Sequence, residues 1–231
     1  MIDVRELRAR RGDTPVLEGL SLRIEDGEFL VVAGPNGSGK TTLVRHFNGL
    51  LEPDSGSVSV DGLPVADNPL AARTAVGMVF QNPEDCFVAA TVGADVAFGP
   101  ETLGLSHEEI DRRVRDALSA VEMQPYRETR IDRLSGGQKA RVAIAGALAM
   151  EPSHLVLDEP FGGLDQPARE SVLRRLESFS ADGTSVVVVT HDLRDLAALA
   201  DRIVVIADGT VALEPDATDD ERLADFGVRP C

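Results

Sequence analysis

The stretch Gly34-Pro35-Asn36-Gly37-Ser38-Gly39-Lys40-Thr41-Thr42 decides the fold of this chain. It follows a short apolar run, 29–33, and its last three residues begin a segment, 40–50, that is predicted to be a helix. The glycines let successive backbone N–H groups converge on phosphate oxygens, and the start of a helix adds partial positive charge. The pattern therefore predicts a nucleotide phosphate-binding loop with the whole stretch as candidate contacts, and not a glycine-rich turn without a ligand.

A second stretch, Leu155-Val156-Leu157-Asp158-Glu159, predicts the acidic half of the same site. An apolar strand that ends in two carboxylates delivers them to the carboxyl edge of a sheet, where α/β proteins bind ligands. We expect Asp158 and the Thr41 hydroxyl to hold Mg²⁺, and Lys40 to neutralise the β- and γ-phosphates. Glu159 is expected to be the general base that activates water. A strand ending in Asp-Glu is usually structural, and its pairing with the phosphate loop is what favours catalysis.

Strand and helix candidates alternate along the chain except over one long stretch. Strands are predicted over 2–9, 20–24, 29–33, 57–60, 76–80, 155–157, 186–189 and 203–206, with a turn at Gly12-Asp13. Helices are predicted over 40–50, around 172–179 and over 193–200. From Asn82 to Met150 the chain is mostly helical, with a capping box at Ser106-His107-Glu108-Glu109 and a helix from about Gly137. The pattern predicts a parallel α/β core interrupted by a helical subdomain.

Length and composition exclude several classes of protein. The chain of 231 residues suits one core with a subdomain. No apolar run is long enough to cross a bilayer, and Met1 to Glu6 carries charges where a signal peptide needs apolar residues. Two cysteines, Cys86 and Cys231, are too few for a disulfide framework or a four-cysteine zinc site. We therefore expect a cytoplasmic protein that reaches any membrane through a partner, without direct membrane insertion.

The chain is strongly acidic, with a net charge of −16 and only two lysines, Lys40 and Lys139. Such a surface is typical of an ordinary acidic protein or of adaptation to a salty cytoplasm, and the scarcity of lysine favours the second interpretation. Negative surfaces repel phosphate backbones, so nucleic acid is not expected as a partner.

A third stretch, Leu134-Ser135-Gly136-Gly137-Gln138, is far more selective than the phosphate loop. The three stretches in this order resemble the ATP-binding cassette (ABC) ATPases, from about Met1 to Leu213. The resemblance implies one domain over 1–231, with an α/β, RecA-like P-loop NTPase core (1–81 and 151–213) built on a parallel sheet. It also implies an N-terminal antiparallel β subdomain, an inserted α-helical subdomain (82–150) and a short acidic tail (214–231).

The resemblance assigns roles to residues around the nucleotide. Gln81, in Val79-Phe80-Gln81-Asn82-Pro83, matches the glutamine that contacts Mg²⁺ and senses the membrane partner. His191, after the apolar run 186–189, matches the histidine that senses the γ-phosphate. An aromatic residue usually stacks on adenine, but none lies near Arg10 and Arg11, so an arginine is the candidate there.

The same resemblance implies that two copies, or this chain and a related ATPase, sandwich two ATP molecules. Ser135 and the Gly137 N–H then meet the γ-phosphate held by the opposite protomer, with Gly136 and Gln138 in the same run. Asp165, in Gly162-Gly163-Leu164-Asp165, matches the acid of the dimer-contacting loop.

The segment from Gln81 to Pro100 points to a subfamily. It resembles the ATPases of energy-coupling-factor importers, which take up vitamins, cobalt or nickel. Many of those have Gln where this chain has Cys86, and many carry a C-terminal dimerisation region that is missing here. The short form resembles the cobalt, nickel or biotin systems. It implies integral membrane subunits as partners and a place at the cytoplasmic face of the cell membrane.

Three alternatives remain open from the sequence. A soluble ABC ATPase of DNA repair or translation typically needs a coiled coil, tandem cassettes or basic surfaces. A non-hydrolysing nucleotide binder often loses the carboxylate base or the histidine, whereas Glu159 and His191 are both present. A cassette of another transporter class, including an exporter, is disfavoured only by the Gln81–Pro100 segment.

Overall fold

The computed structural model describes residues 1–194, 196–215 and 221–228. Its strands are β1 (Ile2–Arg11), β2 (Thr14–Ile24), β3 (Phe29–Ala33), β4 (Ser55–Val60), β5 (Leu63–Pro64), β6 (Val76–Val79), β7 (His154–Asp158), β8 (Ser185–Val189), β9 (Arg202–Ala207) and β10 (Thr210–Leu213). The helices are α1 (Lys40–Phe47), α2 (Pro69–Ala75), α3 (Val92–Thr102), α4 (His107–Ala120), α5 (Gly136–Ala149) and α6 (Gln166–Ala181). Short 3₁₀ helices are Pro83–Cys86, Gln124–Tyr126, Ile131–Arg133 and Glu221–Phe226.

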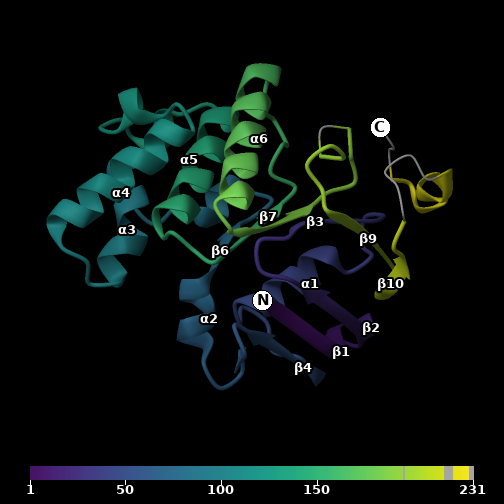
Figure 1. Cartoon of the computed structure of the whole chain (residues 1–231). Helices are drawn as coiled ribbons and strands as arrows, with labels where there is room; N and C mark the ends of the chain where they lie inside the picture. Colours follow the sequence, from purple (N-terminus) through teal and green to yellow (C-terminus); the bar gives the residue numbers. More distant parts are fainter. Residues whose placement is uncertain (195, 216–220, 229–231) are drawn as a thin grey trace.

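Two sheets organise the molecule (Figure 1). The larger has the strand order β10-β9-β3-β8-β7-β6, and all its pairings are parallel except that of the edge strand β10. The smaller, of order β2-β1-β4-β5, is antiparallel. The predicted fold class, a parallel α/β P-loop core with an antiparallel β part and a helical insertion, is confirmed.

The parallel strands are buried on both faces, which explains their unbroken apolar runs. In β3, Phe29 and Val31 pack into the core beneath the helices α3–α6, while Leu30 and Val32 pack into a second core with α1 and the antiparallel sheet. Successive side chains of a strand point to opposite faces, so one apolar run supplies both cores. The strands are thereby held in a fixed register, and their carboxyl ends align along one edge.

The predicted helical stretch between β6 and β7 is confirmed, and α3, α4 and α5 form a lobe beside the large sheet (Figure 1). Ser106 caps α4 by accepting from the Glu109 N–H at 3.3 Å. The predicted capping box is only half formed, because the Glu109 carboxylate binds Arg112 and Arg113 instead.

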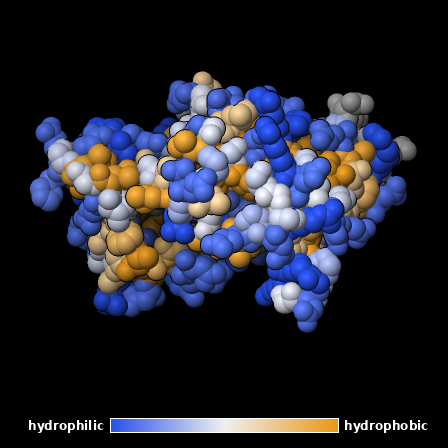
Figure 2. Space-filling model, turned by 90° about the horizontal axis from the view of Figure 1, so that it is seen from below, coloured by the Kyte–Doolittle hydropathy of each residue, from blue (hydrophilic) through white to orange (hydrophobic). Residues whose placement is uncertain are grey.

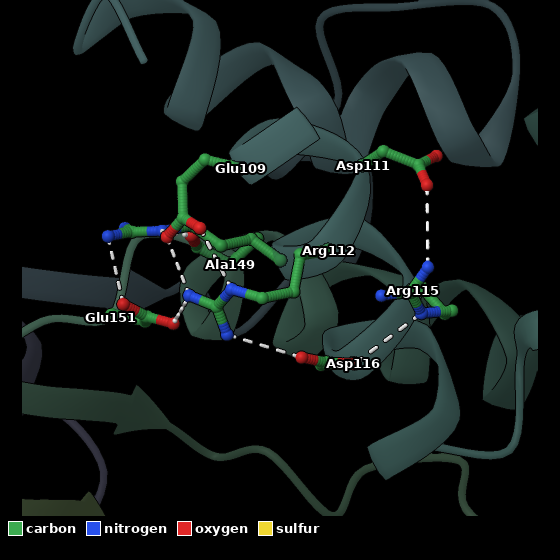
Figure 3. Close-up of polar contacts among 8 residues, drawn as sticks. Glu109, Asp111, Arg112, Arg115, Asp116, Ala149 and Glu151 are labelled. Atoms are coloured by element: carbon green, nitrogen blue, oxygen red, sulfur yellow. Dashed lines mark hydrogen bonds and ion pairs between the residues drawn. The ribbon is translucent and has the colours of Figure 1, made fainter. Parts of the chain in front are cut away.

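An ion-pair network fixes this lobe to the chain that enters β7 (Figure 3). Arg112 binds Glu109 at 2.6 Å and Glu151 at 2.8 Å, and Arg113 binds Glu151 at 2.9 Å. The two guanidinium groups lower the pKa of Glu109 to about 2. Glu151 follows α5 directly, so the network ties α4 to the junction between the helical lobe and the large sheet.

The helix predicted over 193–200 is wrong, because the described residues of this segment form turns. The Leu196 and Leu199 N–H groups bond three residues back, and those of Ala197 and Ala200 bond four residues back. Leu193 and Leu196 are buried, and the Asp201 carboxylate binds the Phe29 N–H at 2.8 Å. Anchored at both ends, the short connection between β8 and β9 folds as tight turns.

Several boundaries differ from the predicted ones. The first helix ends at Phe47, and α2, β5 and β10 have no predicted counterpart. Within the acidic tail, Leu223 and Val228 are buried in the core beneath the helices, so part of the tail packs on the domain. The predicted tail residues 216–220 and 229–231 lie outside the described residues. No helix in the described ranges combines the length and apolarity that crossing a membrane requires.

Candidate nucleotide-hydrolysing site

Four neighbouring strands end at the same edge of the large sheet and carry the predicted site. In the pairing order β3-β8-β7-β6, each strand runs parallel to the next. The phosphate loop follows β3, Asp158 ends β7, His191 lies two residues beyond β8, and Gln81 lies two residues beyond β6. Residues separated by more than 100 positions are therefore brought to one edge by the strand register.

Each glycine of the phosphate loop has a positive φ, and two of them also have no room for a side chain. Gly34 has φ +140°, and a Cβ there would lie 2.1 Å from the Ile206 carbonyl oxygen. Gly39 has φ +103°, and a Cβ there would lie 2.9 Å from the Val16 carbonyl oxygen. Gly37 has φ +81° in open space. Close backbone approach thus demands glycine at the first and last positions, while the middle glycine serves the turn.

Lys40 begins α1 and is buried, yet its ammonium group stays within the loop. Its Nζ donates to the Gly34 and Pro35 carbonyl oxygens at 2.7 and 2.8 Å. Burial lowers the pKa of Lys40, and the carboxylates of Glu159 and Asp158 act against that shift. Pro35 and Asn36 are exposed at the loop, and the buried Ser38 Oγ has no hydrogen-bond partner among the residues described. The loop therefore presents a desolvated cation and a free hydroxyl, which suit an anionic ligand.

Thr41 and Asp158 form the expected pair. The Thr41 hydroxyl donates to Asp158 Oδ2 at 2.7 Å, and burial raises the pKa of Asp158. The other oxygen, Oδ1, is buried and without a partner within the described part of the chain. Hydroxyl and carboxylate oxygens are the ligands that Mg²⁺ prefers, and an unpartnered buried oxygen is where a cation would bind. These residues fit Mg²⁺.

Glu159 is held by two side chains from the end of β8. His191 Nδ1 donates to Glu159 Oε1 at 2.8 Å, and Thr190 Oγ1 donates to Oε2 at 3.3 Å. The backbone of Glu159 has φ +48°, with its N–H bonded to the Val189 carbonyl at 2.9 Å. This strained conformation turns the carboxylate toward the β8 end, away from the strand axis. Glu159 and His191 are therefore brought together as one unit.

Thr190 is a site residue that the sequence reasoning missed. The available signal was its position: a polar residue that directly follows the buried run 186–189 at the ligand-binding edge.

Gln81 lies at the sheet edge that carries the site, as predicted, but it forms no hydrogen bond with Thr41, Asp158 or Glu159. Its side chain is exposed and makes no hydrogen bond to any residue that the structure describes. The next residue, Asn82, caps the 3₁₀ helix Pro83–Cys86 through the Glu84 N–H. Cys86 packs partly buried against the core, and burial raises the pKa of its thiol.

The selective run Leu134–Gln138 lies at the start of α5, outside this site. Ser135 and Gln138 form both halves of a capping box: Ser135 N–H to Gln138 Oε1 at 2.9 Å, and Gln138 N–H to Ser135 Oγ at 3.3 Å. Gly136 is exposed, and a Cβ on Gly137 would lie 3.3 Å from the Gly163 carbonyl. Among the described residues, no hydrogen bond joins this run to the phosphate loop of the same chain.

Asp165 and the arginines near the hairpin have their own local roles. Asp165 caps α6 by accepting from the Ala168 N–H at 3.0 Å. Arg10 and Arg11 pair with Pro15 and Thr14 in the β1–β2 hairpin. The next residue of β2, Val16, is the one whose carbonyl approaches Gly39. The hairpin end thus lies beside the phosphate loop, where the base of a bound nucleotide is expected.

Comparisons with known proteins identify relatives over the whole chain. The family model described as ABC transporter matches residues 17–162. A putative ABC transporter ATP-binding protein of Halobacterium salinarum is 63% identical over 231 residues, the full length of both chains. An energy-coupling factor transporter ATP-binding protein of Methanocaldococcus jannaschii is 42% identical over 93% of this chain and 78% of its own length.

Solved structures agree with these relatives. CbiO1 of Clostridium perfringens, described as part of the ABC transporter complex CbiONQ, superposes with a TM-score of 0.82 at 35% identity. The match covers 93% of this chain and 88% of that chain. A dimeric ATP-binding cassette bound to ADP and Pi superposes with a TM-score of 0.84 at 31% identity, covering 93% and 98% of the two chains.

Proposed function

Because the chain belongs to the ABC transporter ATP-binding family, we propose that it energises an importer of the energy-coupling-factor type. The cargo in this proposal is a metal ion such as cobalt or nickel, or a vitamin such as biotin. The observation that carries the catalytic part is the meeting of Thr41, Asp158, Glu159 and His191 at the edge that bears the phosphate loop. The relative named as an energy-coupling factor subunit and the structure described as part of CbiONQ support the importer class.

In the proposed reaction Glu159 accepts a proton from the attacking water. Thr190 and His191 orient its carboxylate, so the oxygens are held before water arrives. Lys40 neutralises the phosphates, with the Gly34–Thr42 backbone as their cradle. Thr41 and Asp158 would hold Mg²⁺, with Gln81 as a further candidate ligand by the family resemblance, and the ion would supply charge neutralisation at the phosphates. Arg10 or Arg11 would stack on the base.

We propose that two copies close around the nucleotide. The Leu134–Gln138 run makes no hydrogen bond to its own phosphate loop among the residues described, while the Gly136–Gln138 N–H groups begin a 14-residue helix. A helix N-terminus attracts anions, so this one fits a γ-phosphate held by a partner. Asp165 belongs to the loop 162–165, whose Gly163 carbonyl approaches Gly137 at the start of this helix. The dimeric cassette bound to ADP and Pi supports this arrangement.

The dimer proposal predicts a strong effect of Ser135→Arg. The bulky cation at the start of α5 is expected to block closure on ATP and abolish ATP-dependent dimers, measured by size-exclusion chromatography with light scattering. Because this change also removes a helix cap, it costs about 1 kcal/mol of stability.

Ser106→Arg is the matched control, since Ser106 caps α4 in the same way. It should carry the same stability cost and leave dimers intact. Dimers that survive Ser135→Arg unchanged would remove the basis for the sandwich.

The membrane partner is proposed to dock near the 81–100 segment of the helical subdomain, 82–150. Val88 and Phe98 there are 63% and 48% exposed, and Leu70 on α2 is 78% exposed. Figure 2 shows a mostly hydrophilic face on which apolar side chains gather on the side of the α3–α4 lobe. We accordingly place the protein at the cytoplasmic face of the cell membrane, and the net charge of −16 supports a high-salt cytoplasm.

The test is to isolate the tagged chain from native membranes in mild detergent and identify the copurifying proteins. Integral membrane subunits, with ATP hydrolysis stimulated when they are present, are the expected result. A chain that copurifies with no membrane protein would contradict the transport proposal, and copurification with nucleic acid would favour the repair or translation alternative.

A further inference from the structure

A second cluster of chemically active groups lies at the opposite edge of the large sheet. His154 begins β7, Asp61 follows β4, and Asp26 lies in the connection between β2 and β3. One ligand atom from each of the three side chains lies within 4.8 Å of the other two. The His154 side chain is 1% exposed, whereas those of Asp61 and Asp26 are 42% and 77% exposed. A buried imidazole thus faces two carboxylates that reach solvent.

The Ser185 hydroxyl is the hydrogen-bond partner of His154 on the side of the ring away from the two carboxylates. The Ser185 hydroxyl donates its hydrogen to the Glu25 carbonyl at 3.0 Å, and it accepts from the Gly27 N–H at 3.1 Å. His154 Nδ1 lies 3.0 Å from the same oxygen, and when the hydroxyl hydrogen points to the Glu25 carbonyl, Nδ1 is the donor of this bond. In the neutral ring, the other nitrogen, Nε2, then presents a lone pair toward the cluster.

In this tautomer the lone pair faces carboxylate oxygens, and the cation among them is the Met1 ammonium group. Nε2 lies 2.8 Å from Asp61 Oδ1, and two unprotonated acceptors repel at this distance. The Met1 ammonium group bonds to both of these atoms, at 3.2 and 2.8 Å, and also to Asp26 Oδ1. One cationic nitrogen therefore marks the point on which Nε2, Asp61 Oδ1 and Asp26 Oδ1 converge.

We propose that Asp26, Asp61 and His154 form a binding site for a divalent transition-metal ion of the Zn²⁺ class, which takes the place of the Met1 ammonium group among them. One imidazole nitrogen and two carboxylate oxygens suit such a metal, and its charge of about +2 balances the two carboxylates. Ser185 supplies the outer hydrogen bond that orients a metal-bound histidine. Tetrahedral bonds of about 2.1 Å separate ligands by about 3.4 Å, so the exposed Asp26 side chain needs only a small shift.

The site is separate from nucleotide hydrolysis. His154 and Asp158 stand at opposite ends of β7, and four steps of about 3.3 Å place them about 13 Å apart. The metal joins β4 of the antiparallel sheet to β7 of the parallel sheet. Its effect is therefore to fasten the two sheets at the edge remote from the phosphate loop.

The test is titration of the chelator-treated, nucleotide-free protein with Zn²⁺ by calorimetry, with Co²⁺ absorption as a second probe of the ligand set. The wild type is expected to bind one ion per chain at this site and to gain thermal stability that rises with the logarithm of the ion concentration above the Kd. His154→Gln and Asp26→Asn should each weaken binding about 10-fold or more. Asp26→Asn alters an exposed side chain, so this variant is expected to fold even if the core does not accept the change at the buried His154.

Two controls separate this site from other acidic groups. Asp67→Asn changes an exposed carboxylate elsewhere on the surface, and Asp158→Asn removes the carboxylate of the nucleotide site. Both should keep the wild-type affinity for Zn²⁺. The proposal is overturned if Asp26→Asn and His154→Gln bind as the wild type does, if no ion binds, or if Asp158→Asn alone removes the site.

Discussion

Glu159→Gln is expected to lower ATP turnover by about 10²–10⁴-fold while leaving ATP affinity nearly unchanged. The amide keeps the size of the carboxylate and one acceptor oxygen, so the contacts with Thr190 and His191 are partly preserved. It has no basic oxygen to take the proton from water. Release of phosphate under saturating ATP measures the turnover, and equilibrium binding of a fluorescent ATP analogue measures the affinity.

Glu170→Gln is the matched control for this change. Glu170 is exposed on α6 and accepts a hydrogen bond from Gln166 in the same helix, at 3.0 Å. Its variant should turn over ATP at the wild-type rate. If Glu159→Gln also did so, the general base would have to be another residue. A loss of ATP affinity as large as the loss of rate would instead indicate a structural role for Glu159.

The second large effect is expected for Lys40→Ala, which should weaken ATP binding by about 10²-fold or more. The phosphate loop buries the Lys40 ammonium group away from water, and this burial lowers its pKa. Phosphate charge that meets no cation in this buried loop is poorly stabilised. The affinity is measured by calorimetry with ATP and Mg²⁺, and circular dichroism checks that the variant is folded.

The chain offers one matched control, because Lys139 is its other lysine. Lys139 forms an ion pair with Glu84 at 2.6 Å, at the start of α5, and contacts no residue of the phosphate loop in the described ranges. Lys139→Ala should keep ATP affinity within about threefold, since an exposed ion pair contributes little. Equal losses in the two variants would mean that general charge, and not the loop geometry, governs binding.

The local patterns that could be predicted were those with a strong physical cause. A buried parallel strand needs apolar residues on both faces, so the runs at 29–33, 155–157 and 186–189 were predicted as β3, β7 and β8. The turn at Gly12-Asp13 and the helical stretch before β7 also follow from local chemistry. The 193–200 segment was misread because its leucines have helical spacing, yet they serve as anchors of a short connection.

For the site, the sequence predicted which residues take part and their order along the chain, but not which of them contact one another. Asp158 and Glu159 were predicted because two carboxylates end a buried strand, and His191 was assigned by the family resemblance, but their contacts could not be read from spacing. Thr190 was missed for the same reason: its bond to Glu159 depends on the pairing of Asp158 with Val189 across β7 and β8.

By itself the sequence determined the family, the phosphate loop and the identity of the carboxylates, because glycine, lysine and acidic residues have chemistry that no other residue supplies. Only the tertiary structure decided which groups touch. It placed His191 and Thr190 on Glu159, left the Leu134–Gln138 run apart from its own phosphate loop, and gathered Asp26, Asp61 and His154 at the other edge. The physical reason is that strand register and core packing, which act between distant segments, set these distances.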